Sequence, residues 1–497
     1  MSDIINSGER PIKIVLRLAV PSVLEQVLLS LAGLIDTAMV GALGANATAA
    51  IGINAATVWL VQGLIMAVSI SFMFMVARKI GEGRIEEAKQ ITREAITFST
   101  LFGSFLAIVI FVLSPYLPIW LGGEGDVIPL ADKYMRIVGI SFLFLTITNV
   151  FSSIIRSAGN ARMPLIVNAI ANILNIIGNL FLINETIDFS FIGIDLVVKG
   201  AGLGVEGAAL STLFSRVVSA VIFIACVFVA KSPVQIKPKG NYKVSLYSLK
   251  TMVQIGIPTA LERSSLNIGA LVLTAMISKI GTVSIAANHL TNQIESILYL
   301  PAYGVAAAAT TLVGQSIGAG RGDMANKFAW LCTIVNAIMI VSVCIPIFIF
   351  AEPIFRMFTP SEEVIQLGII TLRLAAAFEI TFATFICVSG VCSGSGDVKT
   401  QLIVSTVGMW FVRLWLAYFI GIYLGGGLVA IWIAISADMT WRGISMFLRL
   451  KHKRWLPASL REMAMNDREK EKYRKKEAKR QAKRAEKQRA KELRKIG

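Results

Sequence analysis

The sequence predicts an all-helical integral membrane protein whose twelve spans form two repeated bundles of six helices. Three observations support this prediction. The 497 residues are 55% hydrophobic and only 16% charged, whereas a soluble domain carries roughly 25% charged residues. About a dozen apolar runs follow one another with short polar breaks, and each run approaches the roughly 20 residues that cross a bilayer. The two halves of the chain also match each other in sequence.

A Lys- and Pro-rich stretch divides the expected spans into two sets of six. The first set covers residues 12–40, 48–77, 92–113, 134–156, 163–183 and 205–230. The second set covers residues 250–279, 285–315, 328–351, 366–392, 400–423 and 426–449. We therefore expect an N-terminal six-helix lobe (1–230), a cytoplasmic linker (231–249), a C-terminal six-helix lobe (250–450) and a basic cytoplasmic tail (451–497).

The loops between the spans alternate in charge. Basic residues gather after the second, fourth, sixth and eighth spans, as in Arg84, Arg162, Lys231 and Arg321. The opposite loops, such as GGEGDVIPLAD after the third span, are acidic or neutral. Since Lys and Arg are enriched in cytoplasmic loops, this pattern predicts a multi-pass protein of the cytoplasmic (inner) membrane with both termini in the cytoplasm.

The two halves match at a constant shift of 237 residues. Pro21 corresponds to Pro258, Glu25 to Glu262, and the segment IGEGR after the second span to IGAGR after the eighth. Because each half holds an even number of spans, the halves share one topology, as in transporters with parallel repeats. Such repeats place a solute cavity between two bundles that rock in alternating access. This organisation predicts a transporter rather than a static pore.

One acidic residue inside a span has no acidic counterpart in the repeat. Asp36 lies in the first span, within LIDTAMVG, and Leu273 occupies the matching position of the second half. An acidic side chain at this depth costs roughly 2.5 to 3.5 kcal/mol on insertion scales, so it normally faces a cavity and has a partner. A functional role is the favoured interpretation, and an Asp bonded to nearby backbone is the structural alternative.

Four amide side chains in the fifth span lie on one helical face. Their spacing of four, three and four residues follows the helical period, and they are Asn168, Asn172, Asn175 and Asn179. Amides at this spacing could serve only to hold helices together. Beside Asp36 they also offer oxygens for a hard cation such as Na⁺, or a hydrogen-bonded shell for a proton-carrying carboxylate. We therefore expect the cation site in the N-terminal half, where this amide face lies alongside Asp36.

Four further carboxylates lie at membrane depth. Glu25 and Glu262 occur at matching positions of the two halves, so a structural role is about as well supported as a functional one. Glu295 and Glu379 have no acidic counterpart in the first half. Together with Asn172, these carboxylates are expected to line a substrate cavity, where they would attract cationic solutes. A basic neighbour within the bundle would cancel that attraction.

Most of the net charge lies near the C-terminus. The chain carries +17, and residues 449–497, with 20 basic and 7 acidic residues, account for +13. The tail has no apolar face, so we expect it to stay solvated and to contact anionic lipid, at roughly 1 kcal/mol per Lys or Arg near the surface. Nucleic-acid binding is not expected. The five cysteines lack the spacing of a metal or redox motif.

Two short patterns that are typical of enzymes lack the context they require. GQSIG (314–318) matches a nucleophile elbow, but an elbow needs a strand-to-helix turn and a His partner, and the only histidines are His289 and His452. GLGVEG (202–207) matches a dinucleotide-binding pattern, but no βαβ unit is expected around it. We therefore expect no enzyme activity and no cofactor other than a coupling ion.

Longer segments resemble the multidrug and toxic compound extrusion (MATE) family over about residues 10–450. They are PSVLEQ and LIDTAMVGALG in the first span, SAGNARMP after the fourth, LNIIGN in the fifth and IESILYLPAYGVAAAATTLVGQSIGAGR across the eighth. The resemblance implies two six-helix lobes and the export of cationic or amphipathic drugs in exchange for Na⁺ or H⁺. It also implies that Asp36, Asn175 and Thr212 belong to the cation site. With Asn179 of the same amide face, these residues form the expected cation-coupling set, and Asp36 and Asn175 are the expected ligands of a possible Na⁺ ion.

The resemblance leaves the branch of the family open. DinF-like members often have Asp where this chain has Asn179, so any proton coupling would depend more on Asp36. The acidic positions that the NorM-like branch uses in helices seven and ten have no clear match, since Glu379 lies about one turn away.

These observations predict a cation-coupled antiporter, expected to be a monomer, that exports small organic cations and drugs. A flippase for a lipid-linked precursor is the alternative, but its cavity would need many cationic side chains for pyrophosphate, and the span interiors offer few. An intramembrane enzyme would need convergent catalytic groups, and a channel would need a filter; the sequence provides a signal for neither.

Overall fold

The computed structural model describes residues 8–188, 197–465 and 469–471, and most of them are helical. The first half contains α1 (Pro11–Gly41), α2 (Ala45–Gly81), α3 (Ile85–Leu113), α4 (Leu117–Trp120), α5 (Val127–Ser157), α6 (Arg162–Ile183) and α7 (Gly204–Val229). The second half contains α8 (Leu246–Thr251), η2 (Met252–Gly256), α9 (Ile257–Ser278), α10 (Thr282–Gly318), α11 (Gly322–Ile349), α12 (Ala351–Phe358), α13 (Glu362–Ser395), α14 (Val398–Val407), η3 (Gly408–Leu414), η4 (Ala417–Tyr423), α15 (Gly427–Lys451), α16 (Ala458–Arg461) and η5 (Glu462–Ala464).

Each expected span corresponds to a helix or to a run of helical segments. Most helices extend beyond the expected bounds, because the helical backbone continues into polar residues at the membrane surface. The fourth span, for example, was expected at 134–156, and α5 begins seven residues earlier, at Val127. The seventh span contains a π-helical segment, η2, which ends just before Pro258. A proline has no N–H and its ring crowds the preceding turn, so a local change of helical pitch is expected there.

Several short elements were not predicted. α4 and α12 follow the third span of each half, and the repeat shift places α4 within α12. β1 (Thr186–Asp188) and β2 (Val197–Lys199) pair in antiparallel register between α6 and α7. α8 begins at Leu246, inside the expected linker, because the Ser245 side chain caps it by accepting a hydrogen bond from the Ser248 N–H at 3.3 Å. The linker is therefore shorter than expected.

Ten of the described helices are long and apolar enough to cross a membrane. The helices that complete the set of twelve are α9 and α15, which carry buried charged residues such as Glu262 and Asp438. These residues lower the hydropathy of the two helices without shortening them below the length of a bilayer crossing. The twelve-span, all-helical fold is confirmed.

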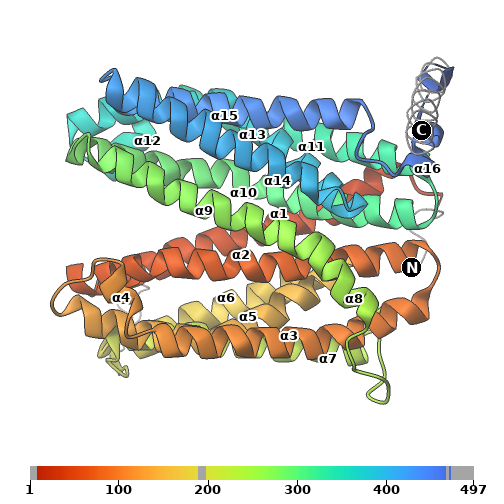
Figure 1. The fold of residues 1–497 in the computed structure, drawn as a ribbon. Helices are drawn as coiled ribbons and strands as arrows, with labels where there is room; N and C mark the ends of the chain where they lie inside the picture. The colour runs from red at the N-terminus through yellow and green to blue at the C-terminus, as the bar shows by residue number, and fades with distance from the viewer. Residues whose placement is uncertain (1–7, 189–196, 466–468, 472–497) are drawn as a thin grey trace, which may run out of the picture.

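Figure 1 shows the helices in two bundles, with α2 to α7 on one side and α9 to α15 on the other. α1 contacts both α6 and α10, so it lies between the bundles. A large apolar core joins α1 to the second bundle through residues such as Leu18, Leu298 and Leu312. A separate core holds the first bundle together around Phe72, Phe151 and other side chains. Each bundle thus has its own interior.

The two bundles meet closely where α2 and α10 end. A Cβ at Gly81 would overlap the carbonyl oxygen of Gln315, and a Cβ at Gly318 would overlap that of Arg78. Gly81 and Gly318 are related by the repeat, so the contact is nearly symmetric. α2 and α9 diverge toward the end of α9, at the opposite end of the molecule (Figure 1). Tight backbone contact between the bundles therefore occurs at the end of the molecule where α2 and α10 finish.

Candidate functional site

Asp36 and Asn179 meet between α1 and α6. The Asn179 amide donates a hydrogen bond to the Asp36 carboxylate, with 2.6 Å between Nδ2 and Oδ1. Asn179 is fully buried, and its Oδ1 has no hydrogen-bond donor among the described residues. A buried polar oxygen without a partner is rare, because losing its hydrogen bond to water is costly. The pair therefore presents a carboxylate and an amide oxygen, which are the ligand types that a hard cation prefers.

Asn175 lies one helical turn before Asn179 and contacts α7. Its Nδ2 lies 3.3 Å from the Ser211 hydroxyl and 3.4 Å from the Thr212 hydroxyl. The Ser211 hydroxyl in turn donates to the Asn175 backbone oxygen at 2.7 Å. A Cβ at Gly178 would overlap Ser211 Oγ, so glycine allows this close approach of α6 and α7. The structure thus joins Asp36 to Asn179, and Asn175 to Thr212, on successive turns of α6.

Arg216 is a basic residue near this site that the sequence analysis did not single out. It lies in α7, and its positive charge attracts the Asp36 carboxylate. Tyr134 lies close to both groups. Its guanidinium donates to the Ser141 hydroxyl at 2.5 Å and lies over the Phe142 ring. A basic residue inside a span was itself a signal, since such residues normally have a partner. Arg216 therefore supplies positive charge near the cation site.

The other two amides of the α6 face have different partners. Asn168 Nδ2 donates to Glu25 Oε1 at 2.7 Å, and Asn172 Nδ2 lies 3.5 Å from the Leu28 backbone oxygen. Both contacts tie α6 to α1. The polar face is thus divided. Its first half holds α6 to α1, as the structural alternative expected, whereas in its second half Asn175 contacts α7 and Asn179 bonds Asp36.

Glu25 forms a buried ion pair with Arg156. The two carboxylate oxygens lie 2.8 and 3.0 Å from Arg156 Nη2, and Asn168 supplies a third hydrogen bond. The backbone carbonyl of Arg156 also accepts a hydrogen bond from Thr311 in α10, at 3.5 Å. These contacts satisfy the Glu25 charge within the protein and link α1, α5 and α10. They favour a structural role for Glu25 over a place in the substrate cavity.

Glu262 has neutral partners instead. Its oxygens accept hydrogen bonds from Gln401 Nε2 and from the Ser405 hydroxyl, each at 2.7 Å. No ion pair to Glu262 occurs within the described part of the chain, although Arg263 and Arg442 act on it at longer range. Glu262 is therefore a buried acid that is held by hydrogen bonds but has no directly bonded countercharge.

Glu295 and Glu379 lie together in the second bundle. They are on α10 and α13, close enough for their charges to repel, and Tyr299 is close to both. Glu379 is fully buried, and neither of its oxygens has a hydrogen-bond donor among the described residues. Arg413 attracts Glu295 but donates its own hydrogen bond to Asp438 at 2.8 Å. The second bundle thus holds two neighbouring buried acids, and the acceptor atoms of Glu379 are unused among the described residues.

Asp438 is a buried acid that the sequence analysis missed. It accepts hydrogen bonds from Arg413 at 2.8 Å and from Arg442 at 2.7 Å, and it is fully buried. The spacing of Asp438 and Arg442, four residues apart on one helix, was a signal for such a pair. Because two guanidiniums share one carboxylate, this cluster keeps positive charge within the second bundle.

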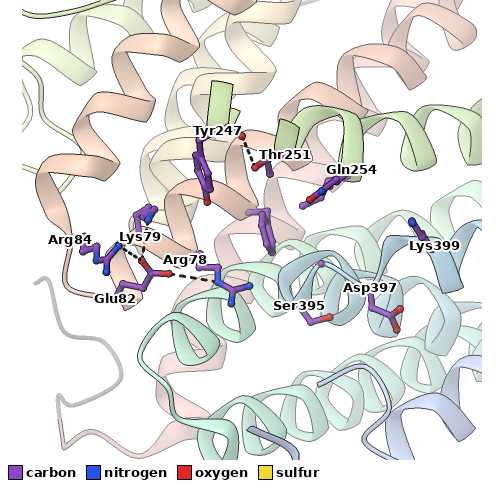
Figure 2. Close-up of a pocket in the computed structure, with 13 residues that line it drawn as sticks. Arg78, Lys79, Glu82, Arg84, Tyr247, Thr251, Gln254, Ser395, Asp397 and Lys399 are labelled. Carbon is purple, nitrogen blue, oxygen red and sulfur yellow. Dashed lines mark hydrogen bonds and ion pairs between the residues drawn. The ribbon is translucent and has the colours of Figure 1, made fainter. Parts of the chain in front are cut away.

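A pocket of about 670 Å³ opens where the ends of the two bundles meet. Figure 2 shows α2 supplying Arg78, Lys79 and Glu82 on one wall, and Asp397 and Lys399 on the other. Lys79 pairs with Glu82 at 3.1 Å. The pocket lies at the end where α2 finishes, whereas Asp36 lies near the end of α1 that is farthest from its first residue. This pocket is therefore separate from the candidate cation site.

Twelve spans in two repeated bundles, with buried acids and amides between the helices, are the architecture of a polytopic membrane transporter. The MatE family model matches residues 21–181 and 258–419, one segment in each half. The chain therefore belongs to the MatE family of multidrug efflux transporters.

Curated relatives match over almost the whole chain. A probable multidrug resistance protein NorM of Thermotoga maritima is 27% identical over 443 residues, covering 89% of this chain and 93% of the relative. The uncharacterized transporter YisQ of Bacillus subtilis is 26% identical over 444 residues, covering 88% of this chain and 93% of its own length.

Solved structures share the fold. A transporter of the MOP superfamily from Pyrococcus furiosus superposes with a TM-score of 0.83 at 22% identity, covering 94% of this chain and 99% of that chain. A structure described as the outward-facing conformation of a multidrug resistance MATE transporter also gives 0.83 at 22% identity, covering 91% and 97%. At this identity the likeness establishes the architecture.

Proposed function

We propose that the chain is a secondary antiporter that exports cationic or amphipathic organic compounds in exchange for Na⁺ or H⁺. The observation that carries the proposal is the Asp36 and Asn179 pair. Asp36 receives the Asn179 N–H at 2.6 Å, and the Asn179 oxygen is buried without a donor among the described residues. A bound cation would satisfy that oxygen and offset the desolvation of the carboxylate.

The coupling step follows from the position of the pair. Asp36 is on α1, which packs against both bundles, while Asn179 is on α6 of the first bundle. Cation binding would draw the two side chains together and hold α1 against α6, and cation release would free α1 to move. A ligand can shift a conformational equilibrium only by binding one state more tightly than the other, and this contact between two helices provides such a difference.

Alternating access would use the contact at the ends of α2 and α10. Gly81 and Gly318 allow the two backbones to touch there. The basic loops favour a cytoplasmic position for this end, and the arrangement would then be that of a transporter closed on the cytoplasmic side. We accordingly propose an inner-membrane protein with cytoplasmic termini, two lobes at 1–230 and 250–450, and a basic tail near anionic lipid. Most of that tail, 472–497, lies outside the described residues.

Substrate recognition is assigned to the second bundle. Both oxygens of Glu379 lack a hydrogen-bond donor among the described residues, Glu295 lies close to it, and Tyr299 supplies an aromatic ring near both acids. A carboxylate next to an aromatic ring suits an organic cation, which gains both charge attraction and a cation–π contact. The flippase alternative would need a cluster of cations that converge on a pyrophosphate, whereas Arg413 and Arg442 both bind Asp438 and Arg216, in the other bundle, acts on Asp36.

The test uses purified protein in liposomes loaded with ethidium. Na⁺ and pH gradients are imposed separately, and efflux is recorded for the wild type, Asp36→Asn and the control Asp126→Asn. Asp126 is exposed in the loop before α5, so its substitution removes the same charge away from the site. Efflux should follow one gradient and fall by at least about tenfold in Asp36→Asn only. Gradient-driven efflux that is unchanged in a folded Asp36→Asn protein would overturn the proposal.

A further inference from the structure

A second pocket, of about 430 Å³, lies between α1 and the beginning of α6. It combines two guanidiniums with apolar side chains, and its lining residues are Leu16, Arg17, Val20, Pro21, Leu24, Arg162, Leu165 and Ile166. Four of the apolar residues, Leu16, Val20, Leu24 and Ile166, are 41% to 54% exposed. Exposed large apolar side chains on a membrane-spanning helix face lipid, so the pocket is a groove that opens to the bilayer.

The two guanidiniums at this groove have capacity for another partner. Arg162 makes no side-chain hydrogen bond or ion pair with any other residue that the structure describes. Arg17 pairs with Glu9 at 3.1 Å, but both side chains are about 40% exposed. An exposed ion pair of this kind contributes little and is easily exchanged. Both cations can therefore turn toward an anion in the groove.

The internal repeat gives the second bundle a matching set of residues, referred to as the second groove. The counterparts of the four exposed apolar residues are Val253, Ile257, Leu261 and Ile403, and they are 51% to 62% exposed. Lys399 stands in the position of Arg162, but Gln254 stands in the position of Arg17. Gln254 and Lys399 are both labelled in Figure 2, on η2 and α14. The two grooves thus share an apolar wall and differ by one cationic side chain.

We propose that the groove between α1 and α6 is a binding site for an anionic phospholipid. Arg17 and Arg162 hold the phosphate, for which the planar guanidinium offers paired N–H donors. One acyl chain lies along Leu16, Val20 and Leu24. The second groove has the same apolar wall but one cation fewer, so it discriminates less between anionic and zwitterionic lipids. Basic pockets between spans are a common way to bind such headgroups.

This inference goes beyond the proposed transport function and holds whichever ion drives it. The groove includes Pro21 and Leu24, and the next residue is Glu25, whose ion pair with Arg156 ties α1 to α5. A lipid bound here would therefore contact α1 beside its attachment to the first bundle. It would add to the contacts that keep α1 on α6.

The test is photo-crosslinking of the full chain in liposomes. Phosphatidylglycerol and phosphatidylcholine that carry the same photoactivatable acyl chain are used in turn, and labelled peptides are mapped by mass spectrometry. The ratio of phosphatidylglycerol to phosphatidylcholine labelling should be about fivefold higher in residues 16–24 than in 253–261, as one extra cation near the surface would give. Mapping to these segments excludes lipid held elsewhere, including by the basic tail.

Exchange of the differing residue provides the matched control. Arg17→Gln should lower the labelling ratio at the first groove until it equals the ratio at the second groove. Gln254→Arg should raise the labelling ratio at the second groove until it equals the ratio at the first. Equal ratios in the wild type, or ratios that both substitutions leave unchanged, would overturn the proposal. Inorganic phosphate is added in a further arm. If it removes the preference, the groove recognises free phosphate rather than a lipid, and the proposal is wrong.

Discussion

Glu25 and Glu262 occupy the same position of the internal repeat but are stabilised in different ways. Each accepts a hydrogen bond from the matching residue of the fifth span of its half, Asn168 for Glu25 and Ser405 for Glu262. Only Glu25 has an arginine, because Ser393 occupies the position that matches Arg156. The scaffold thus retains the acid and one neutral donor in both halves, while the countercharge exists in one. Comparison of the two halves thus distinguishes interactions common to both, the acid and its neutral donor, from an interaction found in one half, the ion pair with Arg156.

The acids that have no acidic counterpart in the other half show a second difference. In the first half the distinctive acid is Asp36, with Asn179 beside it, and the matching positions are Leu273 and Leu416. In the second half the distinctive acids are Glu295 and Glu379. Each half therefore has its own acidic site at a different place in the bundle. We infer a division of roles, with cation coupling in the first half and substrate binding in the second.

The largest effect on stability is expected from Arg156→Met. The substitution leaves the buried Glu25 carboxylate without its countercharge, so the free energy of unfolding should fall by about 3 to 5 kcal/mol. The measurement is equilibrium unfolding of the purified protein in mixed micelles. The double variant Glu25→Leu with Arg156→Met serves as the control, since it removes both charges and should recover much of the loss. Equal stability of the single and double variants would contradict the buried ion pair.

A smaller effect is expected from Gly81→Ala. The added Cβ overlaps the Gln315 carbonyl oxygen, so the contact between α2 and α10 must loosen, at a cost of about 1 to 3 kcal/mol. Gly52→Ala is the matched control, because open space surrounds Gly52 on the same helix. The readout is the labelling rate of a cysteine introduced at Arg78, which should rise in Gly81→Ala alone. An unchanged rate would mean that this contact does not close this end of the molecule.

The smallest effect is expected from Glu262→Gln. The partners of Glu262 are the neutral Gln401 and Ser405 groups, and an amide oxygen can accept one of their hydrogen bonds while the hydroxyl reorients for the other. We expect a change of less than about 1 kcal/mol in the free energy of unfolding. Glu25→Gln, measured alongside, should cost more because Arg156 loses its carboxylate. A larger loss in Glu262→Gln than in Glu25→Gln would reverse the comparison between the halves.

The order of the spans and the repeat could be predicted because hydropathy and internal matches are local properties of the sequence. The structure confirms twelve spans, and helical spacing also anticipated that Asn168 to Asn179 share a face of α6. Partners on distant helices could not be predicted. Arg156 meets Glu25 across 131 residues, and no periodicity encodes that contact. The same holds for Arg216 and Asp438, whose partners Ser141 and Arg413 lie on other helical segments, 75 and 25 residues away in the sequence.

Local geometry explains the remaining differences. α8 begins inside the expected linker because Ser245 caps it, a side-chain contact that hydropathy does not report. The short helices α4 and α12 lie outside the long apolar runs, so a search for membrane spans passes over them. The assignments of Asp36, Asn175, Asn179 and Thr212 to cation coupling stay predictions.

The central claim is that the coupling cation binds in the first half, at Asp36. The most direct measurement is the flux of Na⁺ and of H⁺ that accompanies ethidium export in liposomes, recorded for Asp36→Asn, Glu262→Gln and Glu379→Gln. We predict that a flux of one ion accompanies ethidium export in the wild type and that Asp36→Asn abolishes this ion flux. In Glu262→Gln and Glu379→Gln, the ion flux per exported ethidium should persist. Retention of this flux in Asp36→Asn, with its loss in Glu379→Gln, would place the coupling site in the second half and contradict the account.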